Sequence, residues 1–132
     1  MRVAAVDFTE PETLDAALST GDVVLLVSGS EVGQRVPQHT AVIEAAVRAG
    51  VARLVYTSAP QADTTPLILA PEHKATEEVL RASGLTFTNL RNGWYTENYL
   101  ADVQCAAESR EIVGAYGDGS VARAPRRPFA AS

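Results

Sequence analysis

The sequence contains little cysteine and no long apolar run. Cys105 is the single cysteine of the 132 residues, which excludes an intrachain disulfide and a metal site built from several cysteines. So little cysteine is typical of a reducing compartment, and we expect a cytoplasmic protein whose one thiol is buried. The longest apolar run covers residues 23–27, which is too short to cross a membrane, and residues 1–6 lack the apolar core of a signal peptide. We therefore expect no membrane partner.

Basic residues are also scarce. Eleven Lys and Arg residues stand against 16 Asp and Glu residues, which gives a net charge of -5. This balance repels the phosphate backbone of nucleic acids, so we expect no nucleic-acid partner. Apolar residues make up 46% of the chain, which is enough to fill one hydrophobic core.

Short apolar segments rich in β-branched residues alternate with segments of helical periodicity. Strands are predicted for residues 2–6, 22–27, 53–57 and 85–91. Their nearly continuous apolar character is typical of parallel strands that are covered on both faces. With a helix between each pair, three crossovers would join four parallel strands into one sheet.

The helices between these strands have readable ends. Thr9 and Glu12 form a capping box that predicts the start of the first helix. The second and third helices are predicted to begin near Pro37 and Pro71, and each of the three ends close to a glycine. After residue 91 we expect a polar, helical stretch to residue 108, a turn at residues 117–119 and an irregular tail over residues 120–132. These elements predict an α/β fold, a Rossmann-like doubly wound parallel sheet, within residues 1–119.

Polar residues follow each predicted strand. Asp7 follows the first, Ser28 and Ser30 the second, Thr57 and Ser58 the third, and residues 92–97 the fourth. Ligands of open α/β sheets bind beyond the carboxyl ends of the strands, so these residues are candidates for a binding site. The alternative is that such side chains only satisfy local backbone groups. The loop at residues 28–34 also carries two glycines, but their spacing matches neither phosphate-binding pattern.

The only lysine lies on the third predicted helix. A short-chain dehydrogenase needs a Tyr four residues before its catalytic Lys, but Ala70 stands four residues before Lys74. The same helix carries His73 with Glu77 four residues later. His73 is either a general acid oriented by Glu77 or half of an exposed ion pair.

Three strings of the sequence carry a specific resemblance to a known family. They cover residues 28–39 (SGSEVGQRVPQH), residues 56–73, which begin with YTS and end with APEH, and residues 90–100 (LRNGWYTENYL). Through them the chain resembles the NmrA-like group of atypical short-chain dehydrogenases and, within it, the type 2 NAD(P)H:quinone oxidoreductases. The likeness runs from about residue 3 to residue 119 but covers only the middle of the family's length.

The resemblance implies a site and a reaction. The cofactor would be NADP(H) or NAD(H), with Asp7 facing the adenine and Ser28, Gly29 and Ser30 lining the side where nicotinamide and quinone meet. A second set would close over the cofactor: Asn92, Gly93, Trp94, Tyr95, Thr96 and Glu97. Hydride transfer to the quinone would depend on proximity, with Tyr95 and His73 as candidate catalytic residues and no metal.

The resemblance also implies that the sheet is incomplete. The family's first two strands, its glycine-rich phosphate turn and its C-terminal lobe have no counterpart in the chain. In the strand order 3-2-1-4-5-6, the two absent strands would lie between residues 2–6 and residues 22–27. Their absence would leave residues 2–6 unpaired and a hydrophobic edge exposed, so either residues 2–6 dock beside residues 22–27 or the chain is poorly folded. Three functions remain open: a quinone reductase, a non-catalytic NAD(P)-sensing NmrA-like protein, and an inactive truncated product.

Overall fold

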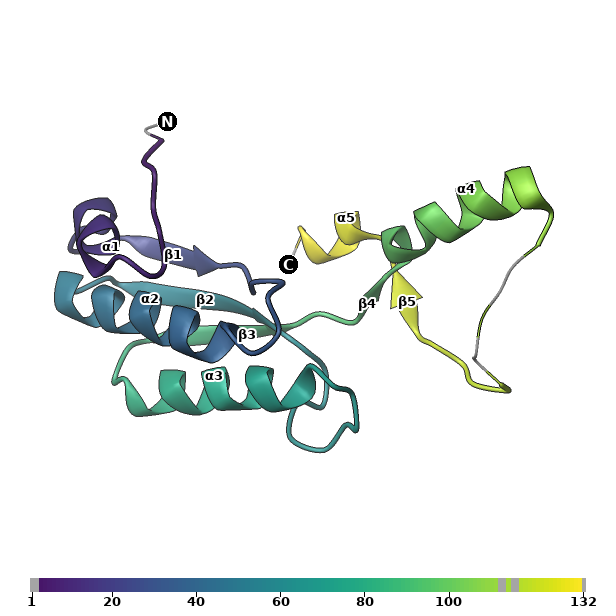
Figure 1. The fold of residues 1–132 in the computed structure, drawn as a ribbon. Coiled ribbons are helices and arrows are strands. Elements are labelled where there is room, and N and C mark those ends of the chain that lie inside the picture. Colours follow the sequence, from purple (N-terminus) through teal and green to yellow (C-terminus); the bar gives the residue numbers. More distant parts are fainter. Residues whose placement is uncertain (1–2, 112–113, 115–116, 132) are drawn as a thin grey trace. The chain divides into compact units, whose positions relative to one another are not determined.

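The computed structural model describes residues 3–111, 114 and 117–131. The chain divides into two compact units, Met1–Arg91 and Asn92–Ser132, whereas the sequence predicted one domain to residue 119. The first unit contains, in order, α1 (Pro11–Ala17), β1 (Val23–Leu26), α2 (Arg35–Ala49), β2 (Arg53–Ser58), α3 (Ala70–Ala82) and β3 (Phe87–Arg91) (Figure 1).

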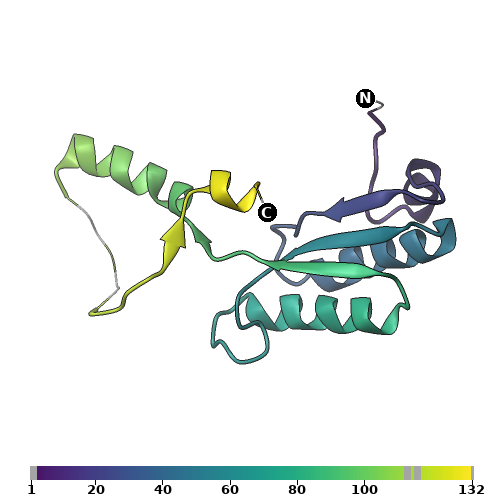
Figure 2. The same cartoon turned by 180° about the vertical axis from the view of Figure 1, so that it is seen from behind.

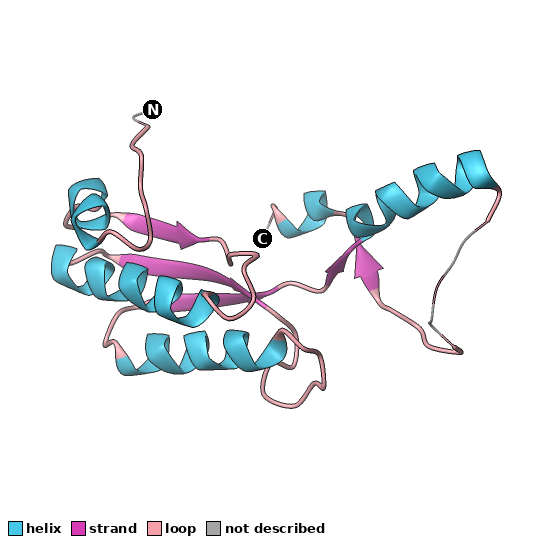
Figure 3. Cartoon of the chain, in the orientation of Figure 1, coloured by secondary structure: helices cyan, strands magenta, loops and turns pink. Residues whose placement is uncertain are grey.

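A parallel sheet of three strands, in the order β1-β2-β3, forms the centre of the first unit. The register places Leu26 beside Tyr56 and Leu54 beside Phe87. Figure 3 shows the helices that connect these strands, α2 and α3, packed along the sheet. This arrangement confirms the predicted α/β fold with its parallel strands and crossover helices.

One face of the sheet forms the hydrophobic core. Leu26, Leu54 and Tyr56 are buried there against Ile43 of α2 and Leu80 of α3. On β1 the side chains that alternate with the buried ones are exposed, and Val23 keeps 69% of its surface accessible. Among the described residues of the first unit, no helix covers that face (Figure 2). The prediction that the strands are covered on both faces is therefore wrong for β1.

Residues 3–6 do not form the predicted first strand. They have no regular secondary structure, and Val3 is 82% exposed. A strand requires a neighbour for its backbone N–H and C=O groups, and β1 pairs only with β2 among the described residues. Without a ladder partner, the apolar character of this segment is not enough to make it a strand.

The start of α1 also differs from the prediction. The helix begins at Pro11, its N-cap is Glu10, and no side chain caps it. Thr9 donates its hydroxyl to the carboxylate of Asp7 instead of capping the helix. The capping box was therefore wrong, because the proline fixes the first helical residue one position further along than a Thr9 cap would.

Gly50 ends α2 in the left-handed conformation, with φ of 69°, as its position after the helix predicted. We expect Gly50→Ala to lower the free energy of unfolding by about 1 kcal/mol, since a Cβ is disfavoured at this φ. The loss would be conformational, because a Cβ there would lie 3.8 Å from the nearest atoms of Thr20. Urea denaturation measures it. Gly50→Asn should recover part of the loss, and equal losses in both variants would contradict the backbone explanation.

The second unit contains β4 (Trp94–Tyr95), the 3-10 helix η1 (Thr96–Tyr99), α4 (Leu100–Ser109), β5 (Arg123–Ala124) and α5 (Arg126–Phe129). β4 and β5 pair in parallel. The helix predicted to reach residue 108 and the turn near Gly117 are present, but the tail is not irregular, since it forms β5 and α5.

Cys105 on α4 is exposed, so the prediction of a buried thiol is wrong. In the described part of the chain, no helix combines the length and apolarity that a membrane span needs.

Candidate functional site

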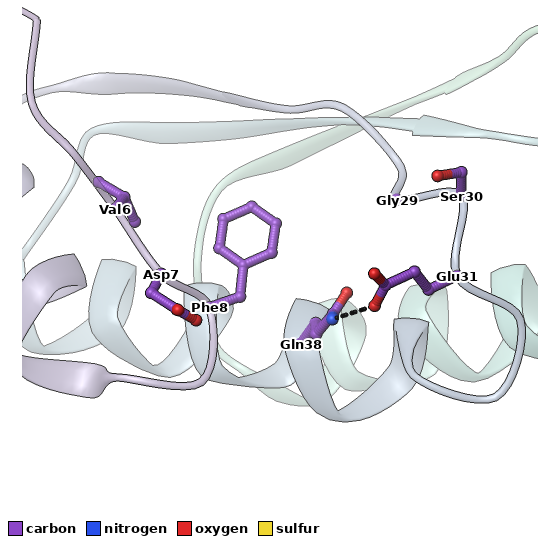
Figure 4. A pocket seen from close by; sticks show the side chains of 7 residues that line it. All are labelled: Val6, Asp7, Phe8, Gly29, Ser30, Glu31 and Gln38. Carbon is purple, nitrogen blue, oxygen red and sulfur yellow. Dashed lines mark hydrogen bonds between the residues drawn. The ribbon is translucent and has the colours of Figure 1, made fainter.

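A pocket of about 330 Å³ lies at the carboxyl end of β1 in the first unit. One wall comes from the segment before α1, and the other comes from the loop between β1 and α2 (Figure 4). The lining residues are Val6, Asp7, Phe8, Gly29, Ser30, Glu31 and Gln38. Three residues predicted from the sequence, Asp7, Gly29 and Ser30, therefore line one pocket.

Asp7 is held by its own chain segment. Its Oδ1 accepts hydrogen bonds from the Thr9 hydroxyl at 2.6 Å and from the Thr9 N–H at 2.8 Å. The two bonds from Thr9 lower the pKa of the Asp7 carboxyl below its usual value. The N–H of Asp7 donates to the hydroxyl of Thr13 in α1. Asp7 is thus an ionised acceptor at neutral pH, fixed to the start of α1.

The opposite wall is anchored by side chains that the sequence analysis did not select. The N–H of Gly29 donates to Nε2 of His39 at 3.1 Å, and its carbonyl accepts from Nε of Arg35. Further along, the N–H of Gly33 donates to the carboxylate of Glu72 at 2.7 Å. Glu72 also forms an ion pair with Arg35 at 3.6 Å. α2 and α3 together therefore hold the loop that forms this wall.

Ser28 is next to the pocket but does not line it. Its N–H donates to the hydroxyl of Thr57 on β2 at 2.8 Å. Thr57 was predicted to be one of the polar residues at the strand ends, and this bond gives it a local structural role. This contact brings together two of the polar residues that were selected after the predicted strands, Ser28 and Thr57.

The predicted site residues 92–97 form a group within the second unit. The amide of Asn92 donates to the hydroxyl of Tyr95 at 3.2 Å. The Tyr95 ring packs edge-on against Phe129, and the guanidinium of Arg126 lies over it, 5.2 Å from its centre. Both carboxylate oxygens of Glu97 accept from the N–H of Arg126, which lowers the pKa of that carboxyl. Tyr95 is therefore held by contacts on several sides.

Gly93, Trp94 and Thr96 belong to the same segment. Gly93 precedes β4, Trp94 is 44% exposed, and Thr96 begins η1. A Cβ at Gly93 would lie 3.8 Å from the Ala122 carbonyl oxygen, so the chain passes close to the start of β5. Residues 92–97 and the tail are therefore packed together in this unit, which the sequence did not predict.

His73 does not make the predicted contact with Glu77. It is 6% exposed, and its Nδ1 lies 2.8 Å from the hydroxyl of Tyr56. Burial lowers the pKa of His73 and raises the pKa of Tyr56 to about 12, so both are neutral at pH 7. Glu77 instead binds Ser58 and Arg91. Neither form of the predicted His73–Glu77 pair is present, because the buried His73 ring is paired with Tyr56 and not with Glu77.

Comparison with known proteins gives concordant matches. A family described as NAD(P)H-binding matches residues 1–125. Quinone oxidoreductase 2 of Escherichia coli strain K12 is 50% identical over 130 residues, which cover 98% of this chain and 46% of that protein. An NmrA-like family domain-containing oxidoreductase of Aspergillus flavus is 37% identical over 101 residues, 71% of this chain and 33% of that one.

Solved structures agree with these matches. The E. coli NADPH-dependent quinone oxidoreductase complexed with NADPH superposes with a TM-score of 0.92 at 50% identity, over 99% of this chain and 46% of that one. The Citrobacter sp. triphenylmethane reductase complexed with NADP(H) gives 0.89 at 32% identity, over 98% and 47%. The chain thus spans less than half the length of these relatives. The predicted resemblance to the NmrA-like group is confirmed, and the chain belongs to the NAD(P)H-binding family.

Proposed function

We propose that this chain forms part of the cofactor site of an NADPH-dependent oxidoreductase that reduces a quinone. The observation that carries the proposal is the pocket beyond β1, where Asp7, Gly29 and Ser30 meet in a chain 50% identical to a quinone oxidoreductase. Ligands of open α/β sheets bind at this end of the strands.

The lining of the pocket indicates which part of the cofactor it would hold. Two carboxylates, Asp7 and Glu31, line it together with the ring of Phe8, and no Lys or Arg is among its described lining residues. Carboxylates accept hydrogen bonds from amino and hydroxyl groups but repel phosphate. The pocket therefore fits the adenine and ribose of the dinucleotide better than its phosphates.

The reacting end of the cofactor would lie at the Ser30 wall of the pocket, on the side away from Asp7 (Figure 4). When bound, the nicotinamide supplies the hydride, and the protein contributes position and electrostatics. We assign Ser28 and Ser30 to the nicotinamide side and residues 92–97 to the segment that covers the cofactor. Tyr95 is the residue we propose beside the quinone, because its hydroxyl is already held by Asn92. Its ring is only partly buried, so the quinone could reach it.

Isothermal titration with NADPH tests the binding part of the proposal. We expect saturable binding, and we expect Asp7→Ala to weaken it about tenfold, since one hydrogen bond to a charged group is worth about 1.5 kcal/mol or more. Glu12→Ala is the matched control, because Glu12 is an exposed carboxylate of α1 outside the pocket. Absence of NADPH binding to the wild-type chain would refute the proposal.

A second candidate function is NAD(P) sensing without turnover. It is favoured by Lys74, which has Ala70 in place of the Tyr of a short-chain dehydrogenase, and by the burial of His73. Steady-state oxidation of NADPH with a simple quinone separates the two functions. Turnover supports the reductase, and binding without turnover supports the sensor.

A further inference from the structure

The backbone N–H and the carbonyl of Gly29, which belong to the two peptide groups on either side of its Cα, are both held by α2. His39 accepts its N–H at 3.1 Å and Arg35 donates to its carbonyl. His39 has no exposed surface, although both of its ring nitrogens carry hydrogen bonds. A buried imidazole with two specific partners does more than fill space, since each partner requires a particular nitrogen to face it.

The neighbouring bonds decide which nitrogen of His39 carries the proton. The Thr76 hydroxyl of α3 donates to the carbonyl of Glu72 at 2.9 Å, so its oxygen is free to act only as an acceptor toward His39. Nδ1 of His39 lies 3.0 Å from that oxygen and must be the donor. Nε2 is then the bare nitrogen that accepts from Gly29. The contacts of α3 thus orient the acceptor that faces the pocket loop.

We propose that His39 is a positioning residue that, as its Nδ1–H tautomer, holds the Gly29 peptide in the conformation in which the loop lines the cofactor pocket. The expected effect of His39 on cofactor binding rests on the proposed function. The expected effect of His39 on the loop is independent of it. Gly29 and Ser30 both line the pocket, and a Cβ at Gly29 would already lie 3.5 Å from Gln38, so a rotation of this peptide changes the wall directly.

A purely structural role makes a different prediction. His39 also packs edge-on against the ring of Tyr56, with 5.4 Å between ring centres. If packing were its only role, two variants of similar size would behave alike. His39→Gln can place an amide oxygen near the position of Nε2, whereas the shorter side chain of His39→Asn reaches only the position of Nδ1. The Gln variant can therefore keep the bond to Gly29, and the Asn variant cannot.

Three measurements on the whole chain test the proposal. Long-range ¹H–¹⁵N NMR should show His39 of the wild type as the Nδ1–H tautomer. Exchange of the Gly29 amide proton should be at least about tenfold faster in His39→Asn than in His39→Gln, because a hydrogen bond worth about 1.4 kcal/mol changes an opening equilibrium tenfold. The Kd for NADPH should rise about tenfold in His39→Asn and much less in His39→Gln.

Each outcome decides the proposal. An Nε2–H tautomer, or equal Gly29 exchange in the two variants, would overturn it. Different exchange with equal NADPH affinity would overturn the part that connects His39 to the pocket. If the wild-type chain does not bind NADPH, the proposed function fails, and the tautomer and exchange measurements still decide whether His39 positions the loop.

Discussion

Replacing Glu77 with alanine should lower the free energy of unfolding by about 3 kcal/mol, because breaking a buried ion pair costs about 3 to 5 kcal/mol. The carboxylate is 1% exposed and accepts from Ser58 at 2.7 Å and from Arg91 at 2.9 and 2.7 Å. Burial alone would raise the pKa of Glu77, but the bonds from Arg91 and Ser58 outweigh it and lower the pKa. The expected loss lies at the lower end of the range because Arg91 is partly exposed and can be hydrated when its partner is gone.

Glu78→Ala is the matched control for this prediction. Glu78 is the next residue of α3, has the same side chain and is exposed, so its removal should change the stability by less than about 0.5 kcal/mol. Urea denaturation of the two variants measures the difference. Equal losses would mean that the helix, and not the buried bonds between β2, β3 and α3, is the source of the effect.

The helices and strands of the first unit were largely predictable because their signals are local. Gly50 and Gly84 follow α2 and α3 and adopt positive φ, as their places after the two helices indicated. The apolar runs of β1, β2 and β3 were placed within two residues of their ends. The predictions that failed are those that depend on which other segments lie next to an element in the fold. Residues 3–6 look like a strand in the sequence, but strand formation depends on a partner that no local pattern can reveal.

The residues of the candidate site also divide into those that a local pattern in the sequence indicates and those that depend on contacts between distant segments. Ser30 could be selected because polar residues that follow a strand lie at a known edge of the sheet. Asp7 was selected by the same rule and lines the pocket, although residues 3–6 before it form no strand. The contacts that hold the loop could not, since His39 and Thr76 lie 37 residues apart in the sequence and meet only when α2 packs on α3. His73 was misread for a related reason. Its spacing to Glu77 is that of a surface pair, but this side of α3 faces the core.

Acidification should destabilise the fold through His39. Burial and the charges of His73 and Arg35 lower the pKa of His39 from 6.5 to about 4, and Glu72 opposes them only in part. A lowered pKa means that the unfolded chain binds the proton more tightly. The stabilising contribution of the neutral ring is therefore complete above pH 6.5 and is lost as the pH falls toward 4. Between pH 7.5 and pH 5.0 this amounts to about 2 kcal/mol of unfolding free energy.

The measurement compares wild type with His39→Gln by urea denaturation at both pH values. His73 also has a lowered pKa and contributes with the same sign in both proteins, so the difference between their pH dependences isolates His39. Equal pH dependence would contradict the assignment. In the folded chain the His39 ring takes up its proton only near pH 4, and that proton occupies Nε2, the atom that accepts from the Gly29 N–H. Protection of the Gly29 amide in the wild type should therefore fall as the pH approaches 4, after correction for the intrinsic exchange rate.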